Sequence, residues 1–225
     1  MFLEKIKANL LIIVFTIFLV VGFAVYLNSF NNEFFWDDED LITKNVYVQS
    51  FRVDKFFTEN EIAGVGQVSN YWRPLLLISF ALDYKLWGLH PIGFHLTNTL
   101  FHIFNAWLLF FIFGYLLAKK LNNDRGYLLS FLASLIFLIH PLQTEAVTYT
   151  AGRGDPMSAL LSLLAIGAYV LFREKKRPCA LAGSLIFFAA ALMVKEQAVF
   201  LPLLLFWSNL FFTARPDLKR CLFLG

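Results

Sequence analysis

Charged residues are scarce in this sequence. Asp, Glu, Lys and Arg make up 16% of its 225 residues, whereas a soluble domain usually has about 25%. Hydrophobic residues make up 59% and stand in long runs that do not alternate with polar residues. A run of about 20 apolar residues matches a hydrocarbon core roughly 30 Å thick. Because barrel strands would alternate, the runs predict an all-α polytopic membrane protein whose first partner is the lipid bilayer.

Several other features are missing. Only two cysteines occur, Cys179 and Cys221, and both fall near expected cytoplasmic ends of helices, which argues against a structural disulfide. The first apolar run has no small-x-small cleavage pattern, so it is interpreted as a retained anchor and not as a signal peptide. No repeat with a period of 20–50 residues is present. Nothing in the composition favours nucleic acid as a partner.

The apolar runs predict about six membrane-spanning helices. Their expected ranges are Ala8–Phe30, Phe94–Ala118, Tyr127–His140, Met157–Phe172, Cys179–Val194 and Ala198–Ala214. The connections expected on the same side of the membrane as the N-terminus are all basic. They contain Lys119, Lys120, Arg125, Arg173, Lys175, Lys176, Arg177, Arg215, Lys219 and Arg220. Cytoplasmic loops are enriched in Lys and Arg. We therefore expect a cytoplasmic N-terminus and place the other connections on the non-cytoplasmic face.

Residues 31–93 form the only long connection and are expected to be the first outer loop. Thr58 to Gly66 is polar and contains glycines, which is typical of a mobile loop. The stretch from Tyr71 to Trp87 is aromatic and amphipathic, and Pro74 suits a first helical turn. We expect a helix lying at the membrane surface, because a spanning helix here would reverse every later loop. Residues 1–225 are interpreted as one membrane domain, which we expect to be incomplete.

Four consecutive acidic residues, Asp37, Asp38, Glu39 and Asp40, follow Trp36 just after the first apolar run. Like charges packed together repel and raise one another's pKa. The segment is therefore either a solvated loop end or an active-site carboxylate pair held at a membrane surface.

Further polar residues are expected on the same face, namely Arg73, His140, Glu145, Arg153, Asp155, Lys195 and Glu196. Charges near membrane depth are costly and are therefore functional candidates. Lys195 and Glu196 interrupt two apolar runs, so they form either an outer turn or a buried kink. Gly152 and Gly154 flank Arg153, which would let backbone amides and a guanidinium converge on an anion; the alternative is that Arg153 simply pairs with Asp155.

Polar residues also occur inside the second apolar run. His95, Asn98, His102 and Asn105 are spaced by 3, 4 and 3 positions, which places them on one helix face. Asn is a poor ligand for transition metals. Hydrogen bonds between helices are therefore favoured over a metal site.

The order of six motifs resembles a known family. The motifs are Trp36-Asp37-Asp38, Tyr71-Trp72-Arg73-Pro74-Leu75, Gly93-Phe94-His95-Leu96-Thr97-Asn98, His140-Pro141 with Thr144-Glu145-Ala146-Val147, Gly152-Arg153 with Asp155, and Lys195-Glu196-Gln197. They resemble the N-terminal membrane half of the GT-C glycosyltransferases, especially the transmembrane-and-TPR-repeat O-mannosyltransferase-like proteins and their bacterial relatives. The TPR repeats and later spans of that family do not occur in these 225 residues, so a missing C-terminal part or a partner subunit is expected.

The resemblance implies an enzyme that moves a mannose-like hexose from a polyprenyl-phosphate donor to a protein or glycan hydroxyl on the non-cytoplasmic face. It also implies that a carboxylate of the first outer loop is the base, and we favour Asp37 with Asp38 in support. Such an inverting transfer needs one base and positive charge near the leaving phosphate. The phosphate-contact candidates are Arg73, Arg153 and Lys195, with His140, Glu145, Asp155 and Glu196 in supporting positions. No cofactor is required, although Asp38 and Asp40 are the pair that would hold a divalent cation.

Two other functions fit the residues less well. A transporter or flippase-like scaffold for a lipid-linked substrate would place polar groups at the bilayer midplane, often in paired repeats, whereas here the charges gather at one face. A non-catalytic membrane scaffold that binds a lipid-linked substrate or a partner subunit is the third alternative. Because no Asn-x-Ser/Thr acceptor is expected to face outward, we expect a bacterial plasma membrane with the active face periplasmic or extracellular.

Overall fold

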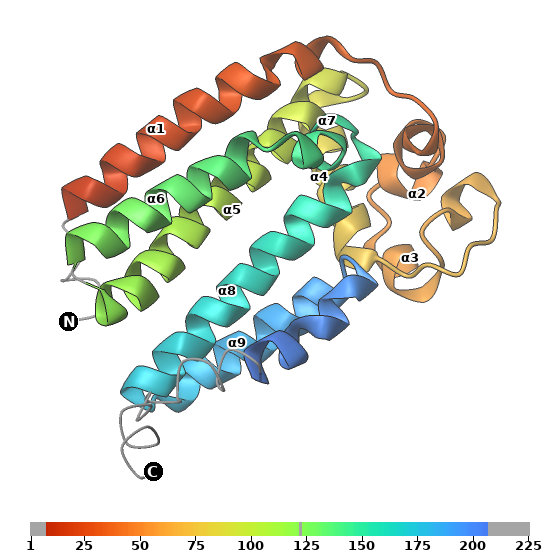
Figure 1. Cartoon of the computed structure of the whole chain (residues 1–225). Helices are drawn as coiled ribbons and strands as arrows, with labels where there is room; N and C mark the ends of the chain where they lie inside the picture. Colours follow the sequence, from red (N-terminus) through yellow and green to blue (C-terminus); the bar gives the residue numbers. More distant parts are fainter. Residues whose placement is uncertain (1–7, 122, 207–225) are drawn as a thin grey trace, which may run out of the picture.

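A computed structural model describes residues 8–121 and 123–206, and within these residues the chain is helical without any strand (Figure 1). The long helices are α1 (Ala8–Tyr26), α5 (Pro91–Lys120), α6 (Asn123–Ile139), α8 (Gly154–Lys175) and α9 (Pro178–Leu192). The short helical segments are η1 (Leu27–Asn31), η2 (Glu39–Thr43), α2 (Val46–Gln49), α3 (Val53–Thr58), η3 (Ala63–Val65), α4 (Pro74–Trp87), η4 (Pro141–Gln143), α7 (Thr144–Thr148), η5 (Ala151–Arg153) and η6 (Glu196–Phe200). The prediction of an all-α membrane protein is confirmed.

Three helical stretches in the described residues are long and apolar enough to cross a membrane, namely Asn9–Asn31, Pro91–Lys120 and Ala151–Lys175. A fourth crossing is formed if α6 and the stretch Pro141–Thr148, bent by 51° at the break, count as one span. α9 has 15 residues, fewer than the roughly 20 that a straight crossing needs. The sixth expected span, Ala198–Ala214, coincides in its first part with the helical stretch Glu196–Phe206. The rest of that span, Cys221 and the last basic connection lie outside the described residues. The number six stays a prediction.

Long helices that are joined by a short turn pack as antiparallel neighbours. α5 and α6 form one hairpin, α8 and α9 form a second, and α1 lies against the first (Figure 1). A buried apolar cluster joins α1 to α5 and α6, with Val14, Phe18, Ile103, Ala106, Phe110 and Leu138. Gly126 lets the two helices of the first hairpin approach closely, because a Cβ there would lie 2.6 Å from the backbone nitrogen of Ala118.

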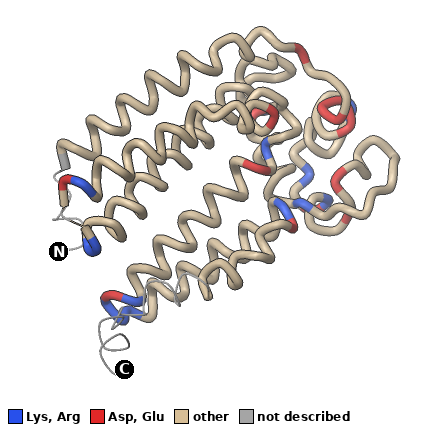
Figure 2. Tube along the Cα trace, in the orientation of Figure 1, with Lys and Arg blue, Asp and Glu red and all other residues tan. Residues whose placement is uncertain are grey.

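Acidic residues are concentrated at one end of these helices, while Lys and Arg occur at both ends (Figure 2). The turn between α5 and α6 and the turn between α8 and α9 both carry Lys and Arg, and both lie at the end where α1 begins. Residues 31–93 and the turns around α7 and η6 lie at the other end, together with most of the acidic residues. The expected separation of basic and acidic connections is therefore present in the fold.

Residues 31–93 fold into a compact cap with its own core, where a mobile loop was expected from Thr58 to Gly66. Its apolar cluster consists of Leu41, Ile42, Val48, Phe56, Leu76, Leu77, Phe80, Ala81 and Phe94. Asn45 organises the cap, because its Oδ1 accepts from the N–H groups of Tyr47 and Val48 while its Nδ2 donates to the carbonyl of Glu61. These bonds satisfy the first turn of α2.

The expected helix after Arg73 is present as α4, with Pro74 in its first turn. One face of α4, including Leu76 and Phe80, is buried in the cap, while Leu82, Leu86 and Trp87 are exposed on the other. An apolar exposed face suits contact with lipid. The position of α4 at a membrane surface stays a prediction.

Candidate active site at the acidic end of the helices

Asp38 is the buried member of the acidic segment, with 1% of its surface exposed. Its Oδ1 accepts from the N–H of Ala151 at 2.6 Å, and its Oδ2 accepts from the N–H of Phe35 at 3.2 Å. Burial raises the pKa of Asp38 to about 6, against the lowering effect of these two bonds and of Arg153, and the charge of Asp37 adds to the increase. Asp38 therefore ties the acidic segment to the start of η5.

Asp37 lies exposed beside this anchor. Its backbone N–H donates to the Tyr149 hydroxyl at 3.0 Å, and the Tyr149 ring lies 4.8 Å from that of Phe35. Burial, with the nearby Asp37 and Asp38 charges, raises the pKa of Tyr149 to about 12. Trp36 is 79% exposed and has a φ of +54°, a conformation that non-glycine residues rarely adopt. Contacts on both sides thus hold a strained turn that presents the Asp37 carboxylate to solvent.

Arg153 does not face solvent, contrary to its expected role at a phosphate. It is completely buried, and its guanidinium donates to Asp83 Oδ2 at 2.5 Å and to Asn98 Oδ1 at 2.7 Å. It also lies over the rings of Phe80 and Phe94. The anion that the Gly-Arg-Gly turn meets is therefore the protein's own Asp83, and the alternative pairing of Arg153 with Asp155 is wrong as well. Arg153 ties α4 and α5 to the start of α8.

Arg73 and Lys195 remain near the surface, each in an ion pair with another predicted site residue. Arg73 donates to Glu196 from Nε at 3.2 Å and from Nη2 at 2.8 and 3.1 Å, and its Nη1 donates to Glu61 at 3.4 Å. Lys195 donates to Asp155 Oδ1 at 2.5 Å. The stretch Lys195-Glu196 is therefore a surface turn at the start of η6, not a buried kink, and it is held to Arg73 before α4 and to Asp155 at the start of α8.

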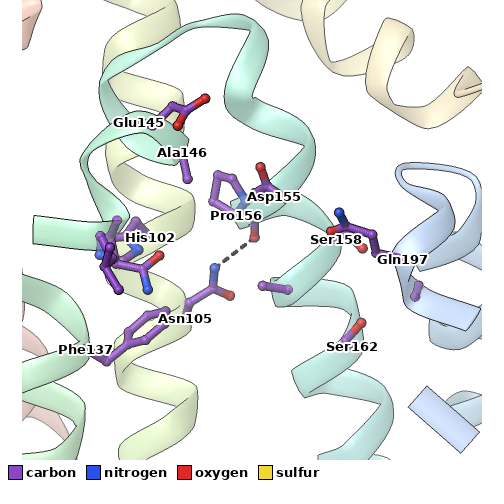
Figure 3. A pocket seen from close by; sticks show the side chains of 14 residues that line it. His102, Asn105, Phe137, Glu145, Ala146, Asp155, Pro156, Ser158, Ser162 and Gln197 are labelled. Atoms are coloured by element: carbon purple, nitrogen blue, oxygen red, sulfur yellow. Dashed lines mark hydrogen bonds between the residues drawn. The ribbon is translucent and has the colours of Figure 1, made fainter. Parts of the chain in front are cut away.

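A cavity of about 500 Å³ opens between α5, α7, α8 and η6 (Figure 3). Glu145, Asp155 and Gln197 stand among its polar lining residues, and Phe137 and Pro156 among its apolar ones. Two of the predicted supporting residues, Glu145 and Asp155, thus share one cavity. His140 is exposed and instead caps η4, because its Nδ1 accepts from the N–H of Leu142.

A metal site at Asp38 and Asp40 finds little geometric support. Both oxygens of Asp38 face backbone N–H groups, which are positive and disfavour a cation. Within residues 8–121 and 123–206, no group of three or more His, Cys, Asp or Glu side chains is arranged to hold a metal ion.

The polar face of α5 forms hydrogen bonds between helices, as predicted. Asn98 donates to the carbonyls of Tyr149 and Thr150, and Asn105 donates to the carbonyl of Pro156. His102 Nε2 lies 3.1 Å from the carbonyl of Leu138, and His95 Nε2 lies 3.2 Å from that of Asn32. This prediction is confirmed, and these bonds position the turns that carry the site.

Three residues at this site were missed in the sequence, namely Glu61, Asp83 and Tyr149. Asp83 carried a usable signal, because it is a single acid inside an apolar helix, where a buried charge needs a partner. Glu61 and Tyr149 carried none, since polar and aromatic residues are ordinary in loops.

Comparisons with known proteins give relatives that are named protein O-mannosyl-transferases. The chain is 33% identical over 183 residues to protein O-mannosyl-transferase Tmtc1 of Drosophila melanogaster, a match that covers 80% of this chain and 20% of the relative. It is 30% identical over 197 residues to protein O-mannosyl-transferase TMTC4 of Homo sapiens, covering 80% and 27%. Human TMTC2 is 34% identical over 157 residues, covering 67% and 18%. No protein-family model and no solved structure matches the chain. The chain therefore spans about a fifth to a quarter of the length of these curated relatives.

Proposed function

The chain is homologous to the protein O-mannosyl-transferases of the GT-C type, and from that premise we propose that it is the catalytic membrane part of a glycosyltransferase. The reaction moves a mannose-like hexose from a polyprenyl-phosphate donor to a hydroxyl, with a protein as the favoured acceptor because the relatives are named for protein mannosylation. The observation that carries the proposal is the acidic turn, in which Asp38 is anchored and Asp37 is presented.

Asp37 acts as the base in this proposal. An acceptor hydroxyl is a weak nucleophile until a base removes its proton, and the base must be within reach of a substrate. Asp37 is exposed, whereas both oxygens of Asp38 are occupied by backbone N–H groups. Asp38 therefore positions the turn, and its neighbour does the chemistry.

Arg73 and Lys195 bind the donor phosphate in this proposal. Each is partly buried and already pairs with a more exposed carboxylate, Glu196 or Asp155. A phosphate offers more charge and more acceptor oxygens than a carboxylate, and Arg in particular binds it through two parallel bonds. The incoming phosphate displaces these carboxylates from the two cations.

The transfer proceeds with inversion. As Asp37 takes the proton, the acceptor oxygen forms a bond to the anomeric carbon of the sugar while the bond from that carbon to the phosphate oxygen breaks. The electron pair of the broken bond stays on the polyprenyl phosphate, whose negative charge Arg73 and Lys195 stabilise. No metal is needed for this step.

The basic residues at one end of the helices support a location for this reaction. With the basic end in the cytoplasm, the acidic turn and its partners face the opposite side of the membrane. Placement in a bacterial plasma membrane stays a prediction, and the relatives named above are animal proteins.

Replacing Asp37 tests the proposal in the natural full-length protein. Asp37→Asn keeps the size of the side chain but removes the base, so the rate of sugar transfer from polyprenyl-phosphate mannose to an acceptor peptide is expected to fall by roughly 10²- to 10⁴-fold. Glu33→Gln is the matched control, because Glu33 is an exposed acid four residues away, and it should retain activity. Unchanged turnover in Asp37→Asn would show that Asp37 is not the base.

A further inference from the structure

The cavity between α5, α7, α8 and η6 contains an unusual acceptor. Asn105 is completely buried, and its Oδ1 has no hydrogen-bond partner. Its amide orientation is determined by its neighbour: the carbonyl of Pro156 can only accept, so the atom 2.8 Å from it must be the Asn105 NH₂. The remaining atom is therefore an oxygen. A buried acceptor without a partner is costly, and Figure 3 shows Asn105 among the side chains that line the cavity.

The other polar groups around the cavity include two carboxylates, which only accept hydrogen bonds, and amides and hydroxyls, which both donate and accept. Glu145 and Asp155 contribute carboxylates, Gln143 and Gln197 contribute amides, and Ser158 and Ser162 contribute hydroxyls (Figure 3). No Lys or Arg is among the described residues that line it. A phosphate inside this cavity would lie beside the carboxylates of Glu145 and Asp155, and Asp155 is already paired with Lys195 at the rim. The cavity instead suits a neutral group that offers many hydrogen-bond donors.

A hexose has this chemistry. Each of its hydroxyl groups donates one hydrogen bond and accepts others, and the C–H face of its ring packs against apolar side chains such as Phe137 and Pro156. The cavity volume of about 500 Å³ lies in the usual range for small-ligand sites, about 300–1,000 Å³. A cation is the competing occupant, but the described residues hold no cluster of metal-ligating side chains.

We propose that this cavity binds the sugar of the donor lipid, with Asn105 Oδ1 accepting from a sugar hydroxyl. The inference rests on the proposed function and adds a division of the donor between two places. The sugar enters the cavity, and the phosphate stays at its rim, where Lys195 pairs with Asp155, one of the lining residues. Asn105 is then a specificity-determining residue for the hexose.

The sugar site and the proposed function can be tested separately by comparing the binding of two lipids. The affinity of the full-length protein in detergent is measured for polyprenyl phosphate carrying mannose and for polyprenyl phosphate without a sugar. The wild-type protein is expected to bind the mannosylated lipid more tightly. Asn105→Leu, which removes the acceptor, should weaken binding of the mannosylated lipid by roughly tenfold and leave binding of the bare lipid unchanged.

Two further variants guard against an effect of misfolding. Ala159→Phe fills the cavity from α8 without removing a hydrogen bond, and it should cause the same selective loss. Ser184→Ala is the control, because the Ser184 hydroxyl is a buried donor to the carbonyl of Ala165 and does not line the cavity; it should keep the wild-type preference.

The outcomes are distinct. If the wild-type protein binds both lipids equally, or if Asn105→Leu and Ala159→Phe keep the preference for the mannosylated lipid, the sugar site is wrong and the proposed function stands. If neither lipid binds, the proposed function itself is overturned, and the sugar site with it. Uptake of Mg²⁺ that Asn105→Leu abolishes, without any preference between the lipids, would identify a cation site instead.

Discussion

Asp38 shows how a single buried carboxylate shapes the acidic turn. It is almost fully buried, yet both of its oxygens accept backbone N–H bonds, one from its own turn and one from η5. Burial opposes its ionisation, the two bonds favour it, and burial prevails, so the pKa rises from 3.8 to about 6. Asp37 and Asp38 are adjacent in the sequence, but Asp37 is exposed and Asp38 is buried. The sequence could not reveal this difference, because both are acids in the same run.

The stability of the protein should depend on pH through Asp38. Because its pKa is raised on folding, the folded state binds the proton more tightly than the unfolded state, so stability is highest below about pH 4 and falls as pH rises toward 6. A shift of about two units corresponds to roughly 3 kcal/mol. Thermal unfolding in detergent between pH 4 and pH 7 measures it. Asp38→Asn should have a flatter profile than the wild-type protein, and parallel profiles would contradict the assignment.

The ion pair of Arg153 and Asp83 should be the most sensitive charged contact in the described residues. Asp83→Ala leaves the buried guanidinium without its carboxylate, which typically costs about 3–5 kcal/mol. The change is measured as a fall in the midpoint of thermal unfolding in detergent. Arg52→Ala, which breaks an exposed pair with Asp54, is the control and should change stability little.

A double replacement separates loss of the pair from loss of shape. Asp83→Leu combined with Arg153→Met removes both charges and keeps apolar volume, so it should recover much of the stability lost in Asp83→Ala. A double variant that is no more stable than Asp83→Ala would show that the buried charges themselves are not the cause.

At the scale of elements, helix boundaries could be predicted and their partners could not. Proline marks the starts of α4, α5 and α9, and α6 ends just before His140-Pro141, because proline suits a first turn and disfavours helix before it. Which acid meets Arg153 could not be predicted in the same way. Asp155 is two positions away and Asp83 is 70 positions away, and burial of the Arg153 side chain decided between them. The compact cap formed by residues 31–93 was missed for a related reason, since its core is built from short helices without clear periodicity.

The first turn of α6 should tolerate no side chain at Gly126. A Cβ there would meet backbone atoms of Ala118 at 2.6 and 2.8 Å, and backbone cannot move aside as a flexible side chain can. Gly126→Ala should therefore lower the free energy of unfolding by about 1–3 kcal/mol, as measured by thermal unfolding in detergent. Gly183→Ala is the control, because a Cβ at Gly183 has no neighbour within 4 Å; equal stability of both variants would contradict the close approach.

At the scale of the whole molecule, the separation of basic and acidic ends could be predicted because it depends on counting charges between apolar runs. The number of crossings could not, because α9 is short and α6 is bent against the following stretch. The cavity was also unpredictable, since Asn105, Glu145 and Gln197 reach it from three elements far apart in the chain.

The proposed orientation can be tested with single cysteines. Val68 is 89% exposed in the cap, and Cys179 is exposed at the basic end. In intact cells, a membrane-impermeant maleimide should label Val68→Cys in a variant that carries Cys179→Ser and Cys221→Ser. In a variant that carries only Cys221→Ser, the same maleimide should label Cys179 only after the membrane is permeabilised. The reverse pattern would place the acidic turn in the cytoplasm.

The partners at the acidic end are far apart in the sequence, and this separation determines when their contacts can form during synthesis. Asp38 contacts Ala151 across 113 positions, and Arg73 contacts Glu196 across 123. At a synthesis rate of about 5–20 residues per second, the ribosome needs roughly 6 to 25 seconds to supply the missing partner. During that interval the cap has been synthesised while these partners are still missing. The contact of Asp38 with Ala151, which anchors the acidic turn, and the pair of Arg73 and Glu196, which joins the start of α4 to η6, can therefore form only late in synthesis.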